Sequence, residues 1–128
     1  MKRIVPSDIY GYEPCSVVAV GCALGITEKN DLKALKSNLL KDDGYLSLAG
    51  MNKLIRANLN VKKRVDYKRG ERPLLVDFAH SHLGQKAIIC VLGHYVYFDG
   101  RDYHSFFWNG KDQVVCVWYL EEVTGYDL

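Results

Sequence analysis

The stretch "KAIICVLGHYVYFDGRDYHSFF" (residues 86–107) decides the fold, because it predicts three strands joined by two tight turns. Its apolar runs are rich in Val, Ile and aromatic residues, and the segments "GH" and "DGRD" separate them. Glycine and Asp-Gly pairs between such runs are typical of β-hairpins. A further run of the same kind, "QVVCVWYL" (113–120), follows the turn signal "NGKD". We therefore predict an antiparallel sheet of about four strands in this half of the chain.

The part of the chain ahead of this sheet has helical periodicity instead. Proline is favoured at the start of a helix, glycine just after its end, and Ser or Asn at the N-cap. These signals predict three helices: 15–25 between Pro14 and Gly25, 31–41 after Asn30, and 48–59 after Ser47, with a break at "DDGY" (42–45). "VKKRV" (61–65) reads as an edge strand, and "RPLLVDFAH" (72–80) as one or two turns of helix.

Helices followed by antiparallel strands predict an α+β fold in which N-terminal helices pack on a C-terminal antiparallel sheet. The chain has 128 residues, which suggests one domain over residues 1–128. We expect a helical half over 1–60 and a sheet half over 61–128.

Composition and charge exclude several classes of function. The net charge is only +2, so nucleic acid and membrane are not expected as partners. The longest uncharged run, 14–27, is too short to cross a membrane, and the N-terminus has no pattern of a signal peptide. We therefore expect a cytoplasmic protein. One basic stretch, 53–72, holds eight Lys or Arg and two acids. It is either a solvated face or a patch for an acidic partner.

The four cysteines do not form a CxxC pair, so no structural zinc site is expected, and neither is any cofactor. Cys90 and Cys116 lie within apolar strands and are expected in the core, as is Cys22. Cys15 differs, because it follows Pro14 at the mouth of the first predicted helix. The N–H dipoles there favour a thiolate and would lower its pKa.

A nucleophilic thiolate also needs a general base and a group that orients the base. His94 begins a predicted strand directly after Gly93. It is either a hydrogen-bonded histidine at the sheet edge or a base aimed at Cys15. His104 lies ten residues later on the next strand, with Asp102 close by, and a hairpin would bring His104 near His94.

A cysteine opening the first helix, a histidine starting a mid-sheet strand and a polar residue on the next strand resemble the papain-like cysteine peptidase superfamily. The segments "PCSVVAVGCALG" and "GHYVYFDGRDYHSFF" carry this resemblance. The compact size is most similar to bacteriocin-processing-type peptidases and their small phage-encoded relatives. The resemblance implies a papain-like fold, a polypeptide substrate, Cys15 as the nucleophile and His94 as the base. For a phage protein it also implies the host cytoplasm as the location.

The chain departs from the family pattern at two places. Where an Asp or Asn is expected to orient the base, His104 stands in the sequence, with Asp102 as a substitute. Where a glutamine is expected to bind the oxyanion, about six residues before the cysteine, the sequence has Ile9, with Ser7 and Asp8 beside it as candidate oxyanion-binding residues. Loss of one such donor costs about 100- to 1,000-fold in rate.

Three hypotheses follow from these residues. The first is a cysteine peptidase or an amide or thioester hydrolase with a Cys15–His94 dyad. The second is a weak or silent papain-like binding module that captures a protein partner, for instance a host protein, through its basic stretch. The third, which we favour least, is a metal-binding protein that uses Cys15, His80, His82 and His94. Since His80 and His82 fall in the polar segment "AHSHLG", we expect them to be exposed loop residues.

Overall fold

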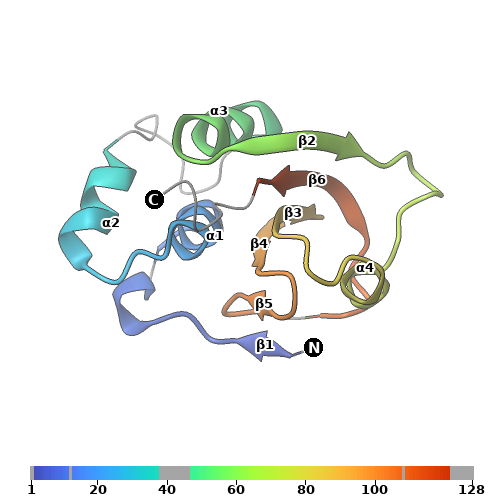
Figure 1. Cartoon of the computed structure of the whole chain (residues 1–128), viewed down its shortest axis with the longest axis horizontal. Coiled ribbons are helices and arrows are strands. Elements are labelled where there is room, and N and C mark those ends of the chain that lie inside the picture. Colours follow the sequence, from blue (N-terminus) through green and yellow to red (C-terminus); the bar gives the residue numbers. More distant parts are fainter. Residues whose placement is uncertain (1, 12, 38–46, 108, 122–128) are drawn as a thin grey trace.

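The centre of the fold is a mixed β-sheet (Figure 1). The computed structural model describes residues 2–11, 13–37, 47–107 and 109–121. In this part of the chain six strands follow the spatial order β1-β5-β4-β3-β6-β2. Their bounds are β1 Arg3–Ile4, β2 Val61–Asp66, β3 Ala87–Val91, β4 His94–Phe98, β5 Tyr103–His104 and β6 Val114–Leu120.

The prediction of a purely antiparallel sheet is wrong at one edge, where β1 pairs with β5 in parallel. The buried carboxylate of Asp102 explains this pairing, because its Oδ1 accepts the N–H of Lys2 at 2.8 Å. Backbone bonds from Tyr103 and Ser105 to Lys2 and Ile4 complete the ladder. A strand from the first sixty residues thus belongs to the sheet, so the helical and sheet parts do not divide cleanly at residue 60.

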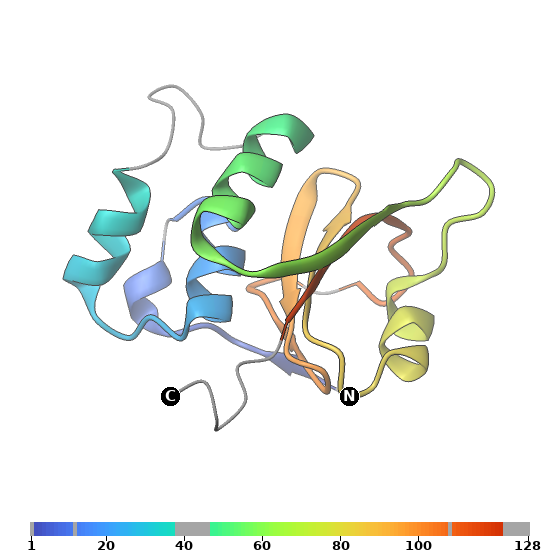
Figure 2. The same cartoon turned by 45° about the horizontal axis from the view of Figure 1, so that its top comes forward.

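Four helices in the described residues cover both faces of the sheet (Figures 1 and 2). Three lie on one face and the fourth lies on the other, which is plain in both views. The bounds on the first face are α1 Cys15–Leu24, α2 Lys29–Lys36 and α3 Leu48–Asn58, and on the second face α4 Leu75–Ser81. A short 3-10 helix, η1 (Asp8–Tyr10), precedes α1.

Burial on both faces explains why β3 reads as an unbroken apolar run. Ile88 and Cys90 belong to the core under α1 and α3, whereas Ala87, Ile89 and Val91 belong to the core under α4. All five residues of the strand are buried. Because alternate residues of a strand point to opposite faces of the sheet, this one continuous apolar stretch contributes side chains to two core layers.

The predicted element ends are largely confirmed. Gly25 ends α1 in the left-handed region at φ 71°, and Ser47 Oγ accepts the N–H of Gly50 at the start of α3. The segments 61–65 and 72–80 contain an edge strand and a short helix, as predicted. The cap at Asn30 is wrong, because α2 begins at Lys29 after Glu28. Residues 38–46, which include the predicted break at "DDGY", lie outside the described residues.

The last strand of the sheet does not extend the β3-β4-β5 meander. β6 lies on the other side of β3 and pairs antiparallel with both β3 and β2. All its residues except Val115 are buried, and β3 and β2 flank it. A strand that is apolar on both faces is more stable between two neighbours than at an edge, because its backbone groups are then paired on both sides.

Gly21 allows η1 to pack against α1. The Tyr10 ring lies over this position, and its hydroxyl donates to the Ile26 carbonyl at 2.7 Å. A Cβ at position 21 would lie 2.6 Å from Cε1 and 2.9 Å from the hydroxyl oxygen of Tyr10. Gly21→Ala is therefore expected to lower the free energy of unfolding by about 1–3 kcal/mol, measured by urea denaturation. In a Tyr10→Leu background the same substitution should cost much less; an equal cost would contradict the steric explanation.

Candidate functional site

Cys15 is the first residue of α1, as the sequence predicts. Pro14 is the N-cap in an extended conformation, and its carbonyl accepts the Val18 N–H at 3.0 Å. The cysteine therefore lies where the first N–H groups of the helix have no partner within the helix. Its side chain is half-buried and packs against the core below α1.

A small pocket opens beside this cysteine. Its volume is about 90 Å³. Small-molecule sites typically have about 300–1,000 Å³, so this pocket admits only a narrow group next to the thiol. The lining residues come from the start of α1, the start of β4 and the segment after β5: Glu13, Cys15, Val18, His94, Tyr95, Ser105, Phe106 and Phe107.

His94 enters this pocket because it is the first residue of β4. Leu92 and Gly93 form the turn between β3 and β4, and Gly93 has a φ of 73°. The Nε2 atom of His94 hydrogen-bonds to Ser105 Oγ at 2.8 Å. The hydroxyl oxygen of Ser105 also accepts the N–H of Phe107 at 3.2 Å. When the His94 proton is on Nε2, Ser105 accepts it, and Nδ1 is the nitrogen that can take up a second proton.

The His94 ring is also held by an aromatic neighbour. The rings of His94 and Phe107 meet edge to face, with their centroids 6.1 Å apart. Phe107 is itself 73% exposed, so it covers the imidazole at the rim of the pocket. A hydrogen bond on Nε2 and a ring contact together restrict the orientation of the imidazole.

The electrostatics of the pocket differ from the expectation for a helix-mouth cysteine. Burial raises the pKa of the Cys15 thiol, and this outweighs the backbone N–H groups of Tyr95, Ser16 and Cys15 itself, which act to lower it. Burial also lowers the pKa of His94, against the opposing field of Asp112. Near neutral pH the pocket therefore holds an uncharged thiol and an uncharged imidazole. The predicted lowering of the Cys15 pKa is wrong because the loss of hydration exceeds the effect of the N–H dipoles.

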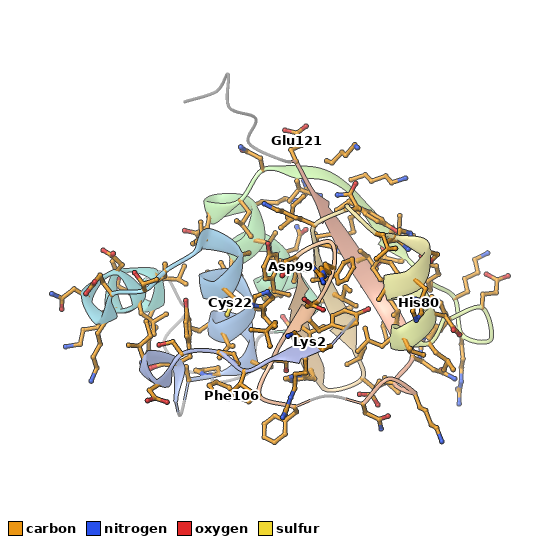
Figure 3. All side chains as sticks on the ribbon, turned by 60° about the horizontal axis from the view of Figure 1, so that its bottom comes forward. Lys2, Cys22, His80, Asp99, Phe106 and Glu121 are labelled. Atoms are coloured by element: carbon orange, nitrogen blue, oxygen red, sulfur yellow. The ribbon has the colours of Figure 1, made fainter. Side chains whose placement is uncertain are left out.

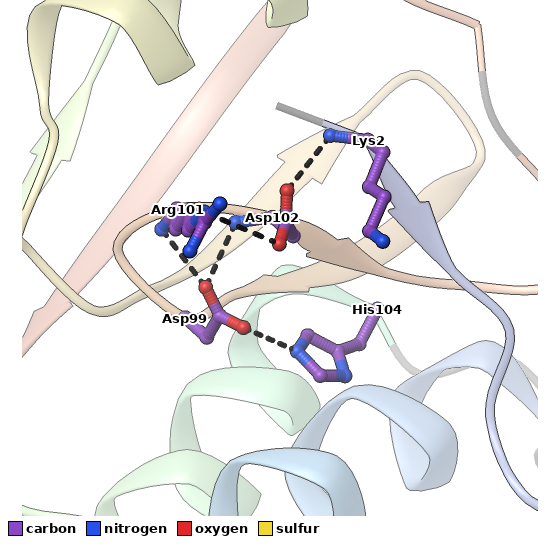
Figure 4. A network of polar contacts seen from close by, with 5 residues as sticks. All are labelled: Lys2, Asp99, Arg101, Asp102 and His104. Carbon is purple, nitrogen blue, oxygen red and sulfur yellow. Dashed lines mark hydrogen bonds and ion pairs between the residues drawn. The ribbon is translucent and has the colours of Figure 1, made fainter.

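His104 and Asp102, the expected orienting residues, have other partners (Figure 4). His104 Nε2 lies 2.7 Å from Asp99 Oδ2, and Asp102 accepts the Lys2 N–H. His104 pairs with Tyr97 across β4 and β5, three residues along β4 from His94. Three residues at about 3.3 Å each, together with the strand spacing of about 4.8 Å, put the two histidine backbones about 11 Å apart. The structure therefore gives His94 a different partner, Ser105.

The Asp99–His104 pair holds the turn between β4 and β5. Burial alone would raise the pKa of Asp99, but the N–H groups of Asp102 and Arg101 and the ring of His104 outweigh it, and the pKa lies below its usual value of 3.8. Asp99 Oδ1 accepts the N–H groups of Arg101 and Asp102 at 2.8 Å each. These hydrogen bonds hold the turn between β4 and β5 in place, and this structural role accounts for the network.

Ser7 and Asp8, the candidate oxyanion-binding residues, also have a different place. Ser7 caps η1 and accepts the Ile9 N–H at 3.5 Å, and both Ser7 and Asp8 are exposed. Neither residue lines the pocket beside Cys15. The N–H groups that act on the thiol there belong to the start of α1 and to Tyr95.

The remaining histidines lie away from Cys15. His80 is exposed on α4, which covers the opposite face of the sheet from α1 and Cys22 (Figure 3). The expectation that His82 is exposed is wrong, because it stacks on Phe78 at 4.0 Å and bonds through Nε2 to the Tyr119 hydroxyl at 3.1 Å. Among the described residues, no three His, Cys, Asp or Glu side chains are arranged to hold a metal ion.

The other cysteines are packing residues. Cys90 and Cys116 are buried, as predicted, at 4% and 0% exposure. Cys22 is half-buried and packs against the core below α1. Burial raises the pKa of both Cys22 and Cys90 to about 11, so neither thiol ionises near neutral pH.

Ser105 is not among the site residues predicted from the sequence, although the length of the turn between β4 and β5 indicates that it lies near His94. The pairs Phe98↔Tyr103 and Tyr97↔His104 fix the register across the four-residue turn. If this register continues, His94 lies opposite Phe107, and Ser105 is the diagonal neighbour on the same face. His104 then points to the other face.

No helix among the residues that the structure describes is long and apolar enough to cross a membrane. Comparison with family models, curated proteins and solved structures found no match to the chain in any of the three.

Proposed function

We propose that this protein is a papain-like cysteine peptidase, or a related amide or thioester hydrolase, with Cys15 as nucleophile and His94 as general base. One observation carries the proposal: Cys15 and His94 line the same small pocket, while Ser105 anchors Nε2 of His94 at 2.8 Å. Ser105 takes the positioning role that the sequence suggested for His104 or Asp102.

The reaction would begin with an uncharged thiol. His94 takes the Cys15 proton as the sulfur attacks the carbonyl carbon of an amide or thioester. The backbone N–H groups of Cys15 and Ser16 at the helix mouth are the donors available for the developing oxyanion. His94 then gives its proton to the leaving amine or thiol, which leaves an acyl group on Cys15. Water attacks this thioester with His94 as base, and the acid product leaves as the Cys15 thiol re-forms.

The pocket favours slow turnover. A serine hydroxyl is neutral, so it stabilises an imidazolium less than a carboxylate does. In addition, the thiol must be deprotonated during each attack, because burial raises its pKa. These features suit an enzyme that acts slowly on one polypeptide.

A binding module without catalysis is the second candidate. The uncharged state of Cys15 and His94 in the pocket favours it as much as it favours a slow enzyme. An uncharged thiol beside an uncharged imidazole is a stable buried pair as well as a resting dyad. In that case the pocket would bind part of a protein partner without cleaving it.

The rate of Cys15 alkylation distinguishes the two candidates. If the dyad works, iodoacetamide at pH 7 should modify Cys15 faster than it modifies Cys22, Cys90, Cys116 or the same cysteine in urea-unfolded chain. General-base assistance of this kind is worth about 100- to 10,000-fold. Peptide mass spectrometry measures the rate at each cysteine. A Cys15 that reacts no faster than the unfolded control would exclude the enzyme and leave the binding module.

A further inference from the structure

One wall of the pocket beside Cys15 lies outside the ladder between β4 and β5. Among the described residues these two strands pair at two positions, which are Tyr103 and His104 on β5. The segment 105–107 follows directly, and all three of its residues line the pocket. We call this segment the pocket wall. The β4–β5 ladder ends before it and does not itself hold it beside His94.

Strand β1, the neighbour of β5 at the edge of the sheet, supplies bonds that hold the pocket wall (Figure 1). The carbonyl of Ile4 accepts the N–H of Ser105 at 3.1 Å. The Nη1 atom of Arg3 donates to the carbonyl of Phe106 at 2.6 Å. Hydrogen bonds from a charged donor are shorter and stronger than neutral ones. The wall is thus fixed by a side chain that lies 103 residues away in the sequence.

The rest of β1 is held by its backbone alone (Figure 4). Asp102 Oδ1 accepts the N–H of Lys2 at 2.8 Å, and the carbonyl of Lys2 accepts the N–H of Tyr103 at 3.0 Å. These bonds do not depend on the side chain of Lys2. Arg3 and Lys2 are therefore neighbouring cations of one strand, of which Arg3 bonds to the pocket wall through its side chain.

The pocket wall in turn orients the imidazole of His94. Ser105 Oγ bonds to Nε2 at 2.8 Å and also accepts the N–H of Phe107, whose ring meets the imidazole edge to face. Ser105 and Phe107 stand on either side of Phe106, the residue whose carbonyl Arg3 binds. A shift of this carbonyl would therefore move both groups that hold the imidazole.

We propose that Arg3 is a positioning residue for His94, and that β1 thereby controls the orientation of the base in the pocket. Arg3 does not line the pocket and acts only through the pocket wall. While Ser105 accepts the proton on Nε2, Nδ1 is the nitrogen that can take the Cys15 proton. This inference rests on the proposed function for its effect on the reaction rate, but not for the orientation of the imidazole.

The orientation is tested without catalysis, from the ¹⁵N chemical shifts of the histidine rings at about pH 8, where an ordinary imidazole is neutral. The spectrum of His94→Ala identifies the His94 signals. We expect a single Nε2–H tautomer in the unmodified protein. In Arg3→Gln the two ring shifts should move toward each other, because a ring that is no longer held populates both tautomers. Lys2→Gln removes the neighbouring charge and keeps the backbone bonds of β1, so it should leave the shifts unchanged. The His82 signals are the internal reference.

The effect on the reaction is tested by alkylation of Cys15 with iodoacetamide at pH 7. Arg3→Gln should slow it about tenfold, which is less than the roughly 100-fold that a misplacement of 1 Å can cost. Arg3→Lys keeps a cationic donor at this position and should restore most of the rate, and Lys2→Gln should not change it.

Unchanged His94 shifts in Arg3→Gln, or the same change in Lys2→Gln, would overturn the positioning role, even if Cys15 reacts as fast as the proposed function requires. A change in the His94 shifts that is confined to Arg3→Gln would support it. If such a change occurs in a protein whose Cys15 reacts no faster than in the urea-unfolded chain, the proposed catalysis is rejected and the positioning role is retained.

Discussion

His94→Ala is expected to lower the rate of Cys15 alkylation at pH 7 by about 100-fold or more. Burial keeps Cys15 protonated at this pH, so attack in the unmodified protein depends on proton transfer to His94. Without the imidazole, the rate should follow the thiolate fraction alone. It should then rise with pH through a pKa above the ordinary thiol value of 9.0, the direction in which burial shifts Cys15. The measurement is the alkylation rate from pH 5 to pH 10, read by mass spectrometry.

Two further variants show whether position in the pocket causes this loss. Ser105→Ala removes the bond to Nε2 and should reduce the rate by less than His94→Ala does. His104→Ala is the matched control, because this histidine bonds to Asp99 outside the pocket. An equal loss in His104→Ala would mean that a general disturbance of the sheet, and not the base, is responsible.

Trp118→Ala is expected to destabilise the protein by about 3–5 kcal/mol, the cost of truncating a large buried side chain. Trp118 is 0% exposed on β6, between β3 and β2. Its Nε1–H donates to Asn52 Oδ1 on α3 at 2.9 Å, so it joins the sheet to a helix. The Tyr95 ring lies 6.4 Å from it, centroid to centroid. Urea denaturation followed by circular dichroism measures the loss.

The chain offers controls for the size and the polarity of this side chain. Trp118→Phe keeps most of the apolar volume and removes the N–H, so it should cost about 1–2 kcal/mol. Phe107→Ala removes an aromatic ring that is 73% exposed, and the stability should change by less than about 0.5 kcal/mol. A similar cost for Phe107→Ala and Trp118→Ala would contradict the assignment of the core.

The candidate site could be predicted only in part. Pro14 before Cys15 and Gly93 before His94 are local sequence signals. Cys15 is indeed the first residue of α1, and His94 is the first residue of β4. The group that holds His94 was not predicted, because the choice between His104 and Ser105 depends on the register across the turn at 99–102. The state of Cys15 was predicted wrongly as well. Helix position is readable from sequence, whereas the burial that raises the thiol pKa depends on the residues around the pocket.

The sequence by itself determined the helices and strands whose ends are set by neighbouring residues. Gly25 and Ser47 end and begin their helices through local backbone geometry and a local hydrogen bond. The alternation and turns of 86–107 likewise determined the β3-β4-β5 meander. Only the tertiary structure decided that β1 joins the sheet in parallel and that β6 lies between β3 and β2. These pairings join residues far apart in the chain. They are stabilised by the hydrogen bond from the Lys2 N–H to Asp102 and by apolar faces that are buried only once the layers have packed.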